Sequence, residues 1–523
     1  MNTNHPQKDR VRQLKNRHQK ARKALRNRAK RIARRIAPRQ FESSPAPLLG
    51  RNDARYEVSE RCVATRFGAL PLLPKLFNQI GLTQTLNDAL HLLKAHLPYH
   101  ESDHIYAIAM AVTADFKCIE GLEILRTDEA LLKALGTPRL PDPTTSRDYL
   151  MRHNNDSIQA MMDAVNAVRV KVWKAQNKAF LNCAVIDADG SIVGTGGEKK
   201  AGAEMSYNGE YGCHPLLVSL AQTQEPLFVV NRPGNVASHD GAAEYLDRAV
   251  KLARAAGFEN VILRGDTDFS QTKFLDGWDA DGVKFVFGYD ARENLIEIAE
   301  ALDAKAWNKF ELPEPFDGVR GPERSKRINY KDLLVIRKNW TCIRTVGEFV
   351  ASFPYKPTAC SKTYRMVVLK KDLAVERGEP TLIANDVRYF FFITNLDESD
   401  LSDDAVVQGA RWRCNQENLI AALKGLGALK LPSHTLAANW AYMVAAALAW
   451  TFKAWLGLTL PRLDDRMAVI KMEYKHFLNT VVAIPAQVVS AARGTVAKLL
   501  AWTENARLIF AAIEGMASLA SSG

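Results

Sequence analysis

Residues 182–191, Asn-Cys-Ala-Val-Ile-Asp-Ala-Asp-Gly-Ser, are the stretch that decides how the rest of the chain is interpreted. The apolar run 183–186 is short and partly β-branched, and the segment stops at Gly190, which is typical of a strand buried on both faces. Asp187 and Asp189 stand two positions apart at its end, so both carboxylates are expected on one side of the strand. Buried carboxylates are costly unless they are paired or bind a metal. From this stretch alone, a strand-end turn made by an Asp side chain is an equally good interpretation.

Two further stretches supply acids that would complete a metal site. A second apolar run ends in Asp266, and the strand ends of open α/β sheets are where such folds place their sites. Further on, Arg413, Glu417 and Lys424 follow one another at i, i+4 and i+11, which puts them on one face of a helix. Two strand-end Asp residues and one helical Glu suit two divalent metals about 4 Å apart, as in phosphoryl transfer. The basic neighbours suit a phosphate backbone.

With these residues the chain resembles a DDE transposase of a bacterial insertion sequence. The family signature near the C-terminus is Tyr, two residues, Arg, three residues, Glu, six residues and Lys. Arg413, Glu417 and Lys424 fit this spacing, whereas Ala410 stands at the Tyr position. The first family acid is usually followed by a small residue and then by Ser or Thr. Asp189 fits that pattern better than the acid two residues before it.

Three blocks between the first two acids strengthen the resemblance, because one branch of these transposases carries similar blocks in the same order. They are Tyr207-Asn208, His214-Pro215-Leu216 and Arg232-Pro233-Gly234-Asn235. The resemblance covers roughly residues 55–515. It implies an α/β fold in which a ribonuclease H-like catalytic core carries a β-rich insertion. An N-terminal helical domain and a C-terminal helical region flank that core.

The resemblance also implies an activity, namely metal-dependent cleavage at the ends of an insertion element and strand transfer into target DNA. Asp189, Asp266 and Glu417 are then the catalytic residues and the ligands of two Mg²⁺ ions, with Mn²⁺ as a substitute. Arg413 and Lys424 are the implied DNA contacts. The implied partners are double-stranded DNA, as terminal inverted repeats and target, and a second copy in a homodimer on DNA. Two alternatives are a non-catalytic DNA-binding regulator derived from a transposase and a ribonuclease H-like nuclease that only cuts.

Composition places the chain in a broad class. Its 523 residues predict two to four domains, and its seven cysteines follow no paired pattern, which favours reduced thiols in a cytosolic protein. No signal-peptide pattern stands at the N-terminus. The most apolar run, 441–450, is too short to span a bilayer and predicts a buried helix. We therefore expect a cytoplasmic, nucleoid-associated protein with no membrane partner.

The net charge of +12 is concentrated in one segment. Residues 1–40 hold fifteen Lys and Arg against one acid, which leaves 55 basic and 57 acidic residues in the remainder. Apolar residues recur every three or four positions from 11 to 36, so a basic helix with a narrow apolar stripe is predicted. The stripe fits pairing with another helix, and the basic face fits a DNA backbone. A solvated, partly disordered tail is the alternative.

The pattern along the chain predicts this division: 1–40 basic helical arm, 41–55 linker, 56–180 helical DNA-binding domain, 181–290 first part of the core, 291–395 β-rich insertion, and 396–523 second part of the core with the Glu417 helix and C-terminal helices. Within 56–180, helices are predicted at 73–80, 83–97, 105–116, 128–135 and 158–172. Strands are predicted at 216–221, 227–231, 261–263, 283–288, 333–337, 342–345, 365–369 and 388–394, with a helix at 242–256.

One motif points to a different enzyme class. His100-Glu101-Ser102-Asp103-His104 matches the zinc-protease pattern, which requires the motif inside a helix with a third ligand. Pro98 stands two residues before it, so the motif is predicted at a helix start. There Ser102 and Asp103 suit helix capping, which is the favoured interpretation.

Overall fold

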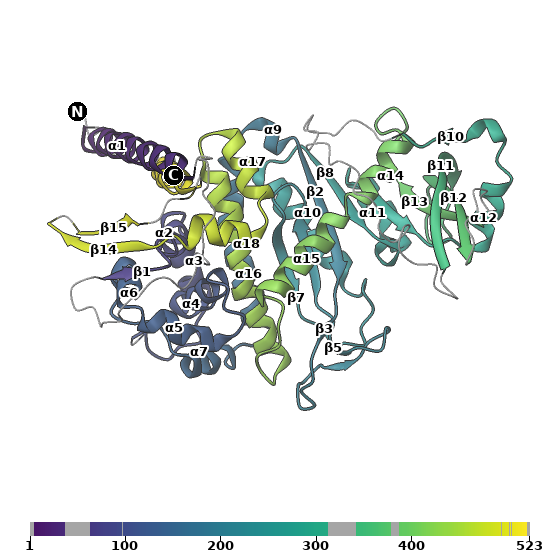
Figure 1. The fold of residues 1–523 in the computed structure, drawn as a ribbon. Coiled ribbons are helices and arrows are strands. Elements are labelled where there is room, and N and C mark those ends of the chain that lie inside the picture. The colour runs from purple at the N-terminus through teal and green to yellow at the C-terminus, as the bar shows by residue number, and fades with distance from the viewer. Residues whose placement is uncertain are drawn as a thin grey trace, which may run out of the picture.

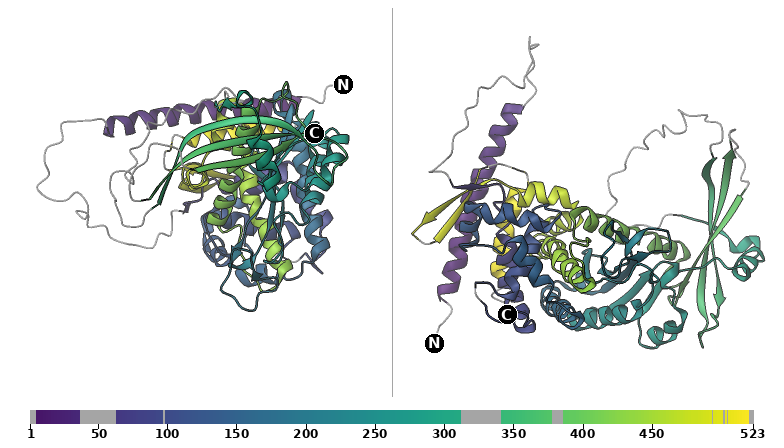
Figure 2. Two further views of the ribbon diagram at one scale, coloured as in Figure 1. Left: turned by 90° about the vertical axis from the view of Figure 1, so that its right-hand side faces the viewer. Right: turned by 90° about the horizontal axis from the view of Figure 1, so that it is seen from below.

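The structure is a computed structural model that describes residues 5–36, 63–96, 98–311, 341–377, 386–492, 494–500, 503 and 505–519. It combines helices with a large mixed sheet, as the α/β prediction requires (Figure 1). A helical part surrounds the long helix α16 (Leu436–Thr459), and the outer strands β10–β13 lie at the opposite end of the molecule (Figures 1 and 2). The linker predicted at 41–55 lies outside the described residues.

A nine-stranded sheet forms the body of the protein. In spatial order its strands are β10 (Asn308–Lys309), β11 (Thr341–Tyr355), β12 (Tyr364–Arg377), β13 (Asp386–Thr394), β9 (Lys284–Tyr289), β8 (Asn260–Gly265), β2 (Cys183–Gly190), β6 (Leu216–Leu220) and β7 (Glu225–Val230). β2, β8 and β9 are parallel, whereas β6 and β7 run antiparallel in a hairpin beside β2. Every residue of β6 and β7 is buried, which explains their continuous apolar character.

Helix α10 (Ala242–Ala256) connects β7 to β8 and covers one face of the sheet, where it contacts β2, β6 and β8. It ends at Gly257, whose φ of 94° is a left-handed conformation that favours glycine. The predicted helix at 242–256 is therefore correct at both ends. Because the crossover carries the chain back to the same edge, β2 and β8 run parallel and end together.

The β-rich segment is bonded to the core sheet. β13 pairs antiparallel with β9 from Phe391↔Tyr289 to Thr394↔Val286, and β12 and β11 follow outward. Their outer ends project beyond the rest of the molecule (Figure 2). The predicted strands 342–345, 365–369 and 388–394 lie within β11, β12 and β13. The strand predicted at 333–337 and the basic residues of 324–327 and 337–338 lie outside the described residues.

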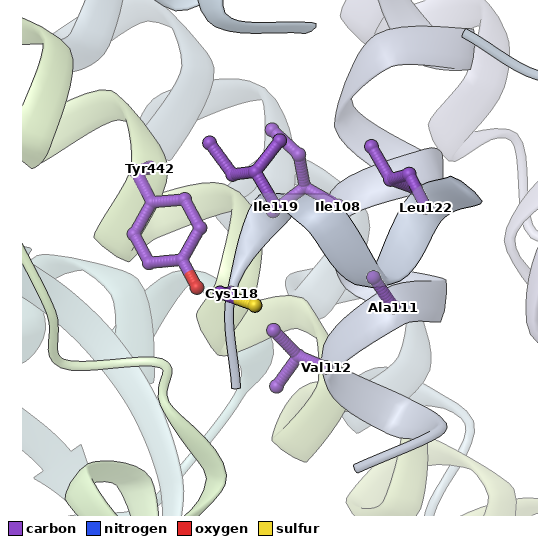
Figure 3. A pocket seen from close by; sticks show the side chains of 7 residues that line it. All are labelled: Ile108, Ala111, Val112, Cys118, Ile119, Leu122 and Tyr442. Carbon is purple, nitrogen blue, oxygen red and sulfur yellow. The ribbon is translucent and has the colours of Figure 1, made fainter. Parts of the chain in front are cut away.

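The helical part packs around α16. Its other helices are α2 (Leu72–Gln79), α3 (Leu82–Ala89), α4 (Glu101–Thr113), η1 (Ile119–Gly121), α5 (Leu122–Thr127), α6 (Glu129–Leu135), α7 (Pro143–Leu150), α8 (Asn155–Lys174), α9 (Lys178–Leu181), α17 (Leu463–Lys471), α18 (Tyr474–Phe477) and η5 (Leu478–Val482). Tyr442 of α16 meets Ile108 and Leu122 at a small apolar pocket with no room for a water molecule (Figure 3). This seam is a packing contact between α4, α5 and α16. α16 is long and apolar enough to cross a membrane by length and composition, and its most apolar window is wholly buried inside the fold.

A buried polar network joins the helical part to the sheet. Glu225 of β7 accepts hydrogen bonds from Arg169 Nε (2.9 Å), Trp173 Nε1 (2.8 Å) and Trp455 Nε1 (2.8 Å). Arg169 and Glu225 are almost completely buried, and their charges are paired as a buried carboxylate requires. The network connects α8, β7 and α16, so the helices and the sheet form one body.

The helix predicted at 83–97 is too long. α3 ends at Ala89, because Leu90 has an extended backbone and the next turn is stabilised differently. Glu101 Oε1 accepts the N–H groups of Leu92 (2.7 Å) and Leu93 (2.9 Å), which replaces the helical hydrogen bonds of that turn. The zinc-protease motif lies at the start of α4, where Asp103 Oδ2 accepts the N–H of His100 at 2.8 Å.

The ends of the chain lie together (Figure 1). Helix α1 (His5–Ile36) packs on the C-terminal helix α19 (Ala506–Leu519), where His18 and Arg22 pair with Glu514 and Leu25 contacts the core. The stripe predicted in the basic helix therefore faces α19. The C-terminal region also holds a hairpin, β14 (Ala486–Ala491) and β15 (Gly494–Leu499), which pairs with β1 (Ala64–Thr65) and which the sequence did not predict.

The remaining elements are small. A separate three-stranded sheet has the order β3 (Val193–Gly194), β5 (Tyr211–Cys213) and β4 (Glu204–Met205). The short helices near the sheet are η2 (Thr267–Phe269), η3 (Thr272–Phe274), α11 (Leu275–Ala280), α12 (Glu293–Glu300), η4 (Ala304–Ala306), α14 (Asp403–Arg411) and α15 (Cys414–Leu426). α14 and α15 bring the second half of the chain back to the carboxyl edge of β2 and β8.

Candidate active site

Two aspartates lie at the edge where the parallel strands β2 and β8 end. The strands pair in register as far as Asp187 and Arg264, so both leave the sheet at the same edge. Asp189 stands near the end of β2 with 9% of its surface exposed, and Asp266 directly follows β8. Asp266 Oδ1 accepts the N–H of Asp268 at 3.0 Å, which caps η2 and fixes the turn. The fold thus brings together two acids that are 77 positions apart.

Glu417 reaches the same edge from the first turn of α15. The helix contacts β2, and the buried side chain of Gln416 fixes it to β6. Gln416 Nε2 donates to Leu217 O at 3.1 Å, and Ser219 Oγ donates to Gln416 Oε1. Because this amide has two partners inside the fold, α15 is held in one rotation about its axis. That rotation leaves Glu417 exposed and directed toward Asp189 through Arg413.

The Arg413 guanidinium lies among the three acids. Its Nη1 is 3.1 Å from Asp189 Oδ2 and 4.0 Å from Asp266 Oδ2, while its Nη2 is 3.2 Å from Glu417 Oε1. One cation therefore joins all three predicted site residues. The competing view, in which Arg413 pairs with an acid at the start of α14, does not fit these contacts. Asp403 pairs with Arg365 instead.

The electrostatics of the cluster favour a positive charge at its centre. Burial raises the pKa of the Asp189 carboxyl to about 7, Arg413 opposes that rise, and the neighbouring charges of Asp266 and Glu417 add to it. Burial likewise raises the pKa of Asp266, again against Arg413. Each acid therefore resists ionisation unless a cation is nearby. A perturbed pair of this kind at the end of a sheet is a candidate functional site.

The donor set fits a divalent ion, although the side chains as they stand hold Arg413 instead. Carboxylate oxygens are the ligands that Mg²⁺ prefers. Among the residues that the structure describes, no three His, Cys, Asp or Glu side chains are close enough together to hold a metal ion. The guanidinium takes the charge-compensating position that a metal would take, so metal binding requires Arg413 to move away.

Asp187 has a different role from Asp189. It is almost completely buried and forms a two-pronged pair with Arg264, with distances of 2.7 Å to Nε and 2.8 Å to Nη2. Arg264 Nη1 also donates to Gly409 O at 2.9 Å. The pair links β2, β8 and α14. The two carboxylates leave the same strand, yet one is consumed by a structural ion pair and the other faces the acid cluster.

Lys424 lies near the cluster, two turns along α15. Its Nζ donates to Ile192 O at 2.6 Å, three residues after Asp189, and partial burial lowers the pKa of the ammonium. The predicted DNA contact thus has a backbone partner, and it fixes the segment that leaves β2. Its neighbourhood also holds Gly190, where a Cβ would come within 2.6 Å of His214 Nε2. Glycine after the first acid is therefore required by close packing.

Sequence reasoning missed three residues that organise the site. Arg264 follows an apolar run and could have been recognised as a charge inside a strand, which needs a partner. Gln416, next to Glu417, carries no sequence pattern that identifies it. His214 stood in a block noted only for its resemblance, and its Nδ1 lies 2.8 Å from Val236 O, so it donates there.

The chain matches the family model described as "Transposase DDE domain group 1" over residues 64–520. That match covers most of the sequence, and it includes all three acids and both basic residues. The class defined by the fold and the acid cluster is thus a transposase with a DDE domain. The protein belongs to this transposase DDE domain family, group 1.

Other comparisons add little. No curated protein matches this chain. A solved structure that does match is described as "Cryo-EM structure of piggyBac transposase synaptic complex with hairpin DNA". It has 11% sequence identity and a TM-score of 0.34, and the match covers 81% of this chain and 84% of that chain. This likeness is distant, so the family assignment stands on the family match alone.

Proposed function

We propose that this protein is a metal-dependent transposase that cleaves DNA at the ends of an insertion element and joins the ends to target DNA. The observation that carries the proposal is the meeting of Asp189, Asp266 and Glu417 around one cation. The family supplies the class of reaction. The acids come from two strand ends and one helix, as a site that must hold phosphate and metal together requires.

The strand order supports a ribonuclease H-like core for this site. Three strands in antiparallel succession, β2, β6 and β7, are followed by a helix and the parallel strands β8 and β9. The first acid stands on the first of these strands and the second follows the fourth. In this proposal β10–β13 are an insertion that widens the sheet between the second and third acids.

Asp189, Asp266 and Glu417 would hold two Mg²⁺ ions, with Mn²⁺ as a substitute. When bound, such ions activate the attacking water or 3′ hydroxyl and stabilise the leaving oxygen. Arg413, once it leaves the acids, is placed to hold a phosphate with its planar fork. Lys424 fixes the segment after Asp189 and adds positive charge beside the path of the DNA strand. Gln416 keeps Glu417 in line with the two aspartates.

The DNA partner is supported by the charge on α1. With its stripe packed on α19, the helix turns its exposed basic residues outward, and these are Lys20, Arg22, Lys23, Arg26, Lys30, Arg31 and Arg34. Such a face suits a phosphate backbone. Terminal inverted repeats and target DNA, a homodimer on DNA, and a cytoplasmic place at the nucleoid complete the proposal.

The test is cleavage and joining of DNA that carries the ends of the element. Asp189→Asn, Asp266→Asn and Glu417→Gln are each expected to abolish Mg²⁺- or Mn²⁺-dependent nicking while binding persists. The matched control is Asp290→Asn, because Asp290 is an exposed acid that follows β9 at the same edge of the sheet.

Each result has a defined meaning. Strong residual nicking by any one of the three variants would remove that acid from the site. A wild-type chain that binds element ends and does not nick them would support the non-catalytic regulator instead. Nicked products that are never joined would support a nuclease that only cuts.

A further inference from the structure

Tyr207 is a large aromatic residue in an unusual position. It lies in the turn between β4 and β5, and its side chain is 83% exposed, which is the highest value for a large hydrophobic residue in the part of the chain that the structure describes. Met205, two residues earlier, is also exposed. Single exposed apolar residues are common, so exposure alone assigns no role to this ring. Its setting does.

The turn that carries Tyr207 is rigid. Ser206 Oγ donates to Glu210 O at 2.7 Å, and Glu210 N–H lies 3.1 Å from Asn208 Oδ1. Gly209 completes the turn with a φ of 81°, a conformation that favours glycine. These bonds hold the backbone on both sides of the ring. The aromatic group is therefore presented to solvent from a fixed frame, and little conformational freedom is lost when it meets a partner.

A short series of contacts connects this ring to the acids. The Tyr207 ring centroid is 6.2 Å from that of His214. His214 Nε2 lies where a Cβ on Gly190 would be 2.6 Å away, and Gly190 directly follows Asp189. On the other side of that segment, Lys424 Nζ bonds Ile192 O. The exposed ring thus stands beside the candidate active site and near a cation.

We propose that Tyr207 stacks on a base of the DNA next to the phosphate that the acid cluster acts on. The inference rests on the proposed function and deepens it, because it assigns one contact with the DNA bases to a named side chain. Phosphate contacts position DNA, but the bases beside a cut strand present flat apolar faces that only such a ring can cover. Stacking tolerates any base, so it suits an enzyme that must grip its substrate next to the cut.

The experiment uses the full chain and element-end DNA with 2-aminopurine beside the cleavage position, without divalent metal, so that binding is measured apart from catalysis. Fluorescence quenching of the base reports stacking, and a titration gives the affinity. Wild type and Tyr207→Phe are expected to quench equally. Tyr207→Ala is expected to lose most of the quenching and to bind about tenfold more weakly.

The matched control is Leu463→Ala, since Leu463 is another strongly exposed apolar residue (63%) at the start of α17, away from β3 and β5 (Figure 1). It should bind and quench as wild type does. Because Tyr207 is exposed, its substitution is not expected to unfold the chain, and an unchanged melting temperature checks this.

Three outcomes would overturn the proposal. If Tyr207→Ala quenches and binds like wild type, which itself binds and nicks, the ring does not touch DNA and the proposed function is unaffected. If Tyr207→Phe fails as badly as Tyr207→Ala, the contact is a hydrogen bond from the hydroxyl group. If wild type neither binds nor nicks element ends, the stacking proposal and the proposed function both fail.

Discussion

Arg413 offers the sharpest test of the acid cluster, because it compensates three negative charges at once. Replacing it by Ala leaves Asp189 partly buried without a cation. The contact at 3.1 Å to Asp189 carries most of the effect, since a hydrogen bond to a charged group contributes about 1.5–3 kcal/mol. The contact with Glu417 is worth about 0–1 kcal/mol, because the Glu417 side chain is 56% exposed and screened by water.

The expected loss for Arg413→Ala is therefore about 2–4 kcal/mol in the free energy of unfolding, measured with a chelator present. The pH should be about 8, above the pKa of about 7 that burial gives Asp189, so that the carboxyl cannot escape the loss by taking up a proton. For a domain of ordinary size each kcal/mol lowers Tm by about 2–4 °C. A fall of several degrees is expected for the transition of the sheet.

Addition of Mg²⁺ or Mn²⁺ provides the decisive comparison. In wild type a metal must displace the guanidinium, whereas in Arg413→Ala the oxygens are free. The metal-induced rise in Tm should thus be larger for the variant, and at a concentration a hundredfold above Kd it corresponds to about 2.7 kcal/mol. Arg411→Ala is the matched control, since Arg411 pairs with Glu348 at 2.5 Å, away from the acids. A variant that melts like wild type in chelator, or gains no more from metal, would refute the reasoning.

Three further predictions follow from the same structure. Because burial raises the pKa of Asp189 to about 7, the folded state holds a proton that the unfolded chain releases, so stability should fall as pH rises from about 4 to about 7; Asp189→Asn should flatten this fall, which is at most about 4 kcal/mol, and equal slopes in urea titrations would contradict it. Asp187→Asn should cost about 3–5 kcal/mol by leaving Arg264 buried without its partner, and a Tm like that of wild type would exclude a structural pair. Gln replacements on the outward face of α1 should flatten the dependence of log affinity on log salt by about 0.9 per lost phosphate contact, and an unchanged slope would remove the arm from the DNA interface; the positions to replace are Lys20, Lys23, Arg26, Lys30 and Arg31.

The sequence predicted the central strands well because their burial leaves a simple pattern. Continuous apolar runs mark β6 and β7, whose residues are all buried. The α10 boundaries followed from a glycine that the backbone requires at position 257. Such features are local, so they can be recognised in one stretch of chain at a time.

Errors arose where distant residues decide local structure. The helix predicted at 83–97 kept its apolar period beyond Ala89, but the carboxylate of Glu101 takes the amide groups of the next turn. The hairpin β14–β15 has an exposed second strand and little alternation, so its pairing with β1 could not be foreseen. Neither outcome is encoded within the stretch that changes.

The site shows the same division, and it explains why the choice between two aspartates needed a structure. Asp187 and Asp189 share a strand and a face, so period and burial cannot separate them. Arg264 separates them, because register places it opposite Asp187 and its fork satisfies both oxygens of that carboxylate. Asp189 is left as the acid on β2 that Arg413 reaches, and Gln416 sets the rotation of α15 that brings Arg413 there. The spacing of the acids is written in the sequence, whereas their distinction depends on neighbours supplied by other strands and helices.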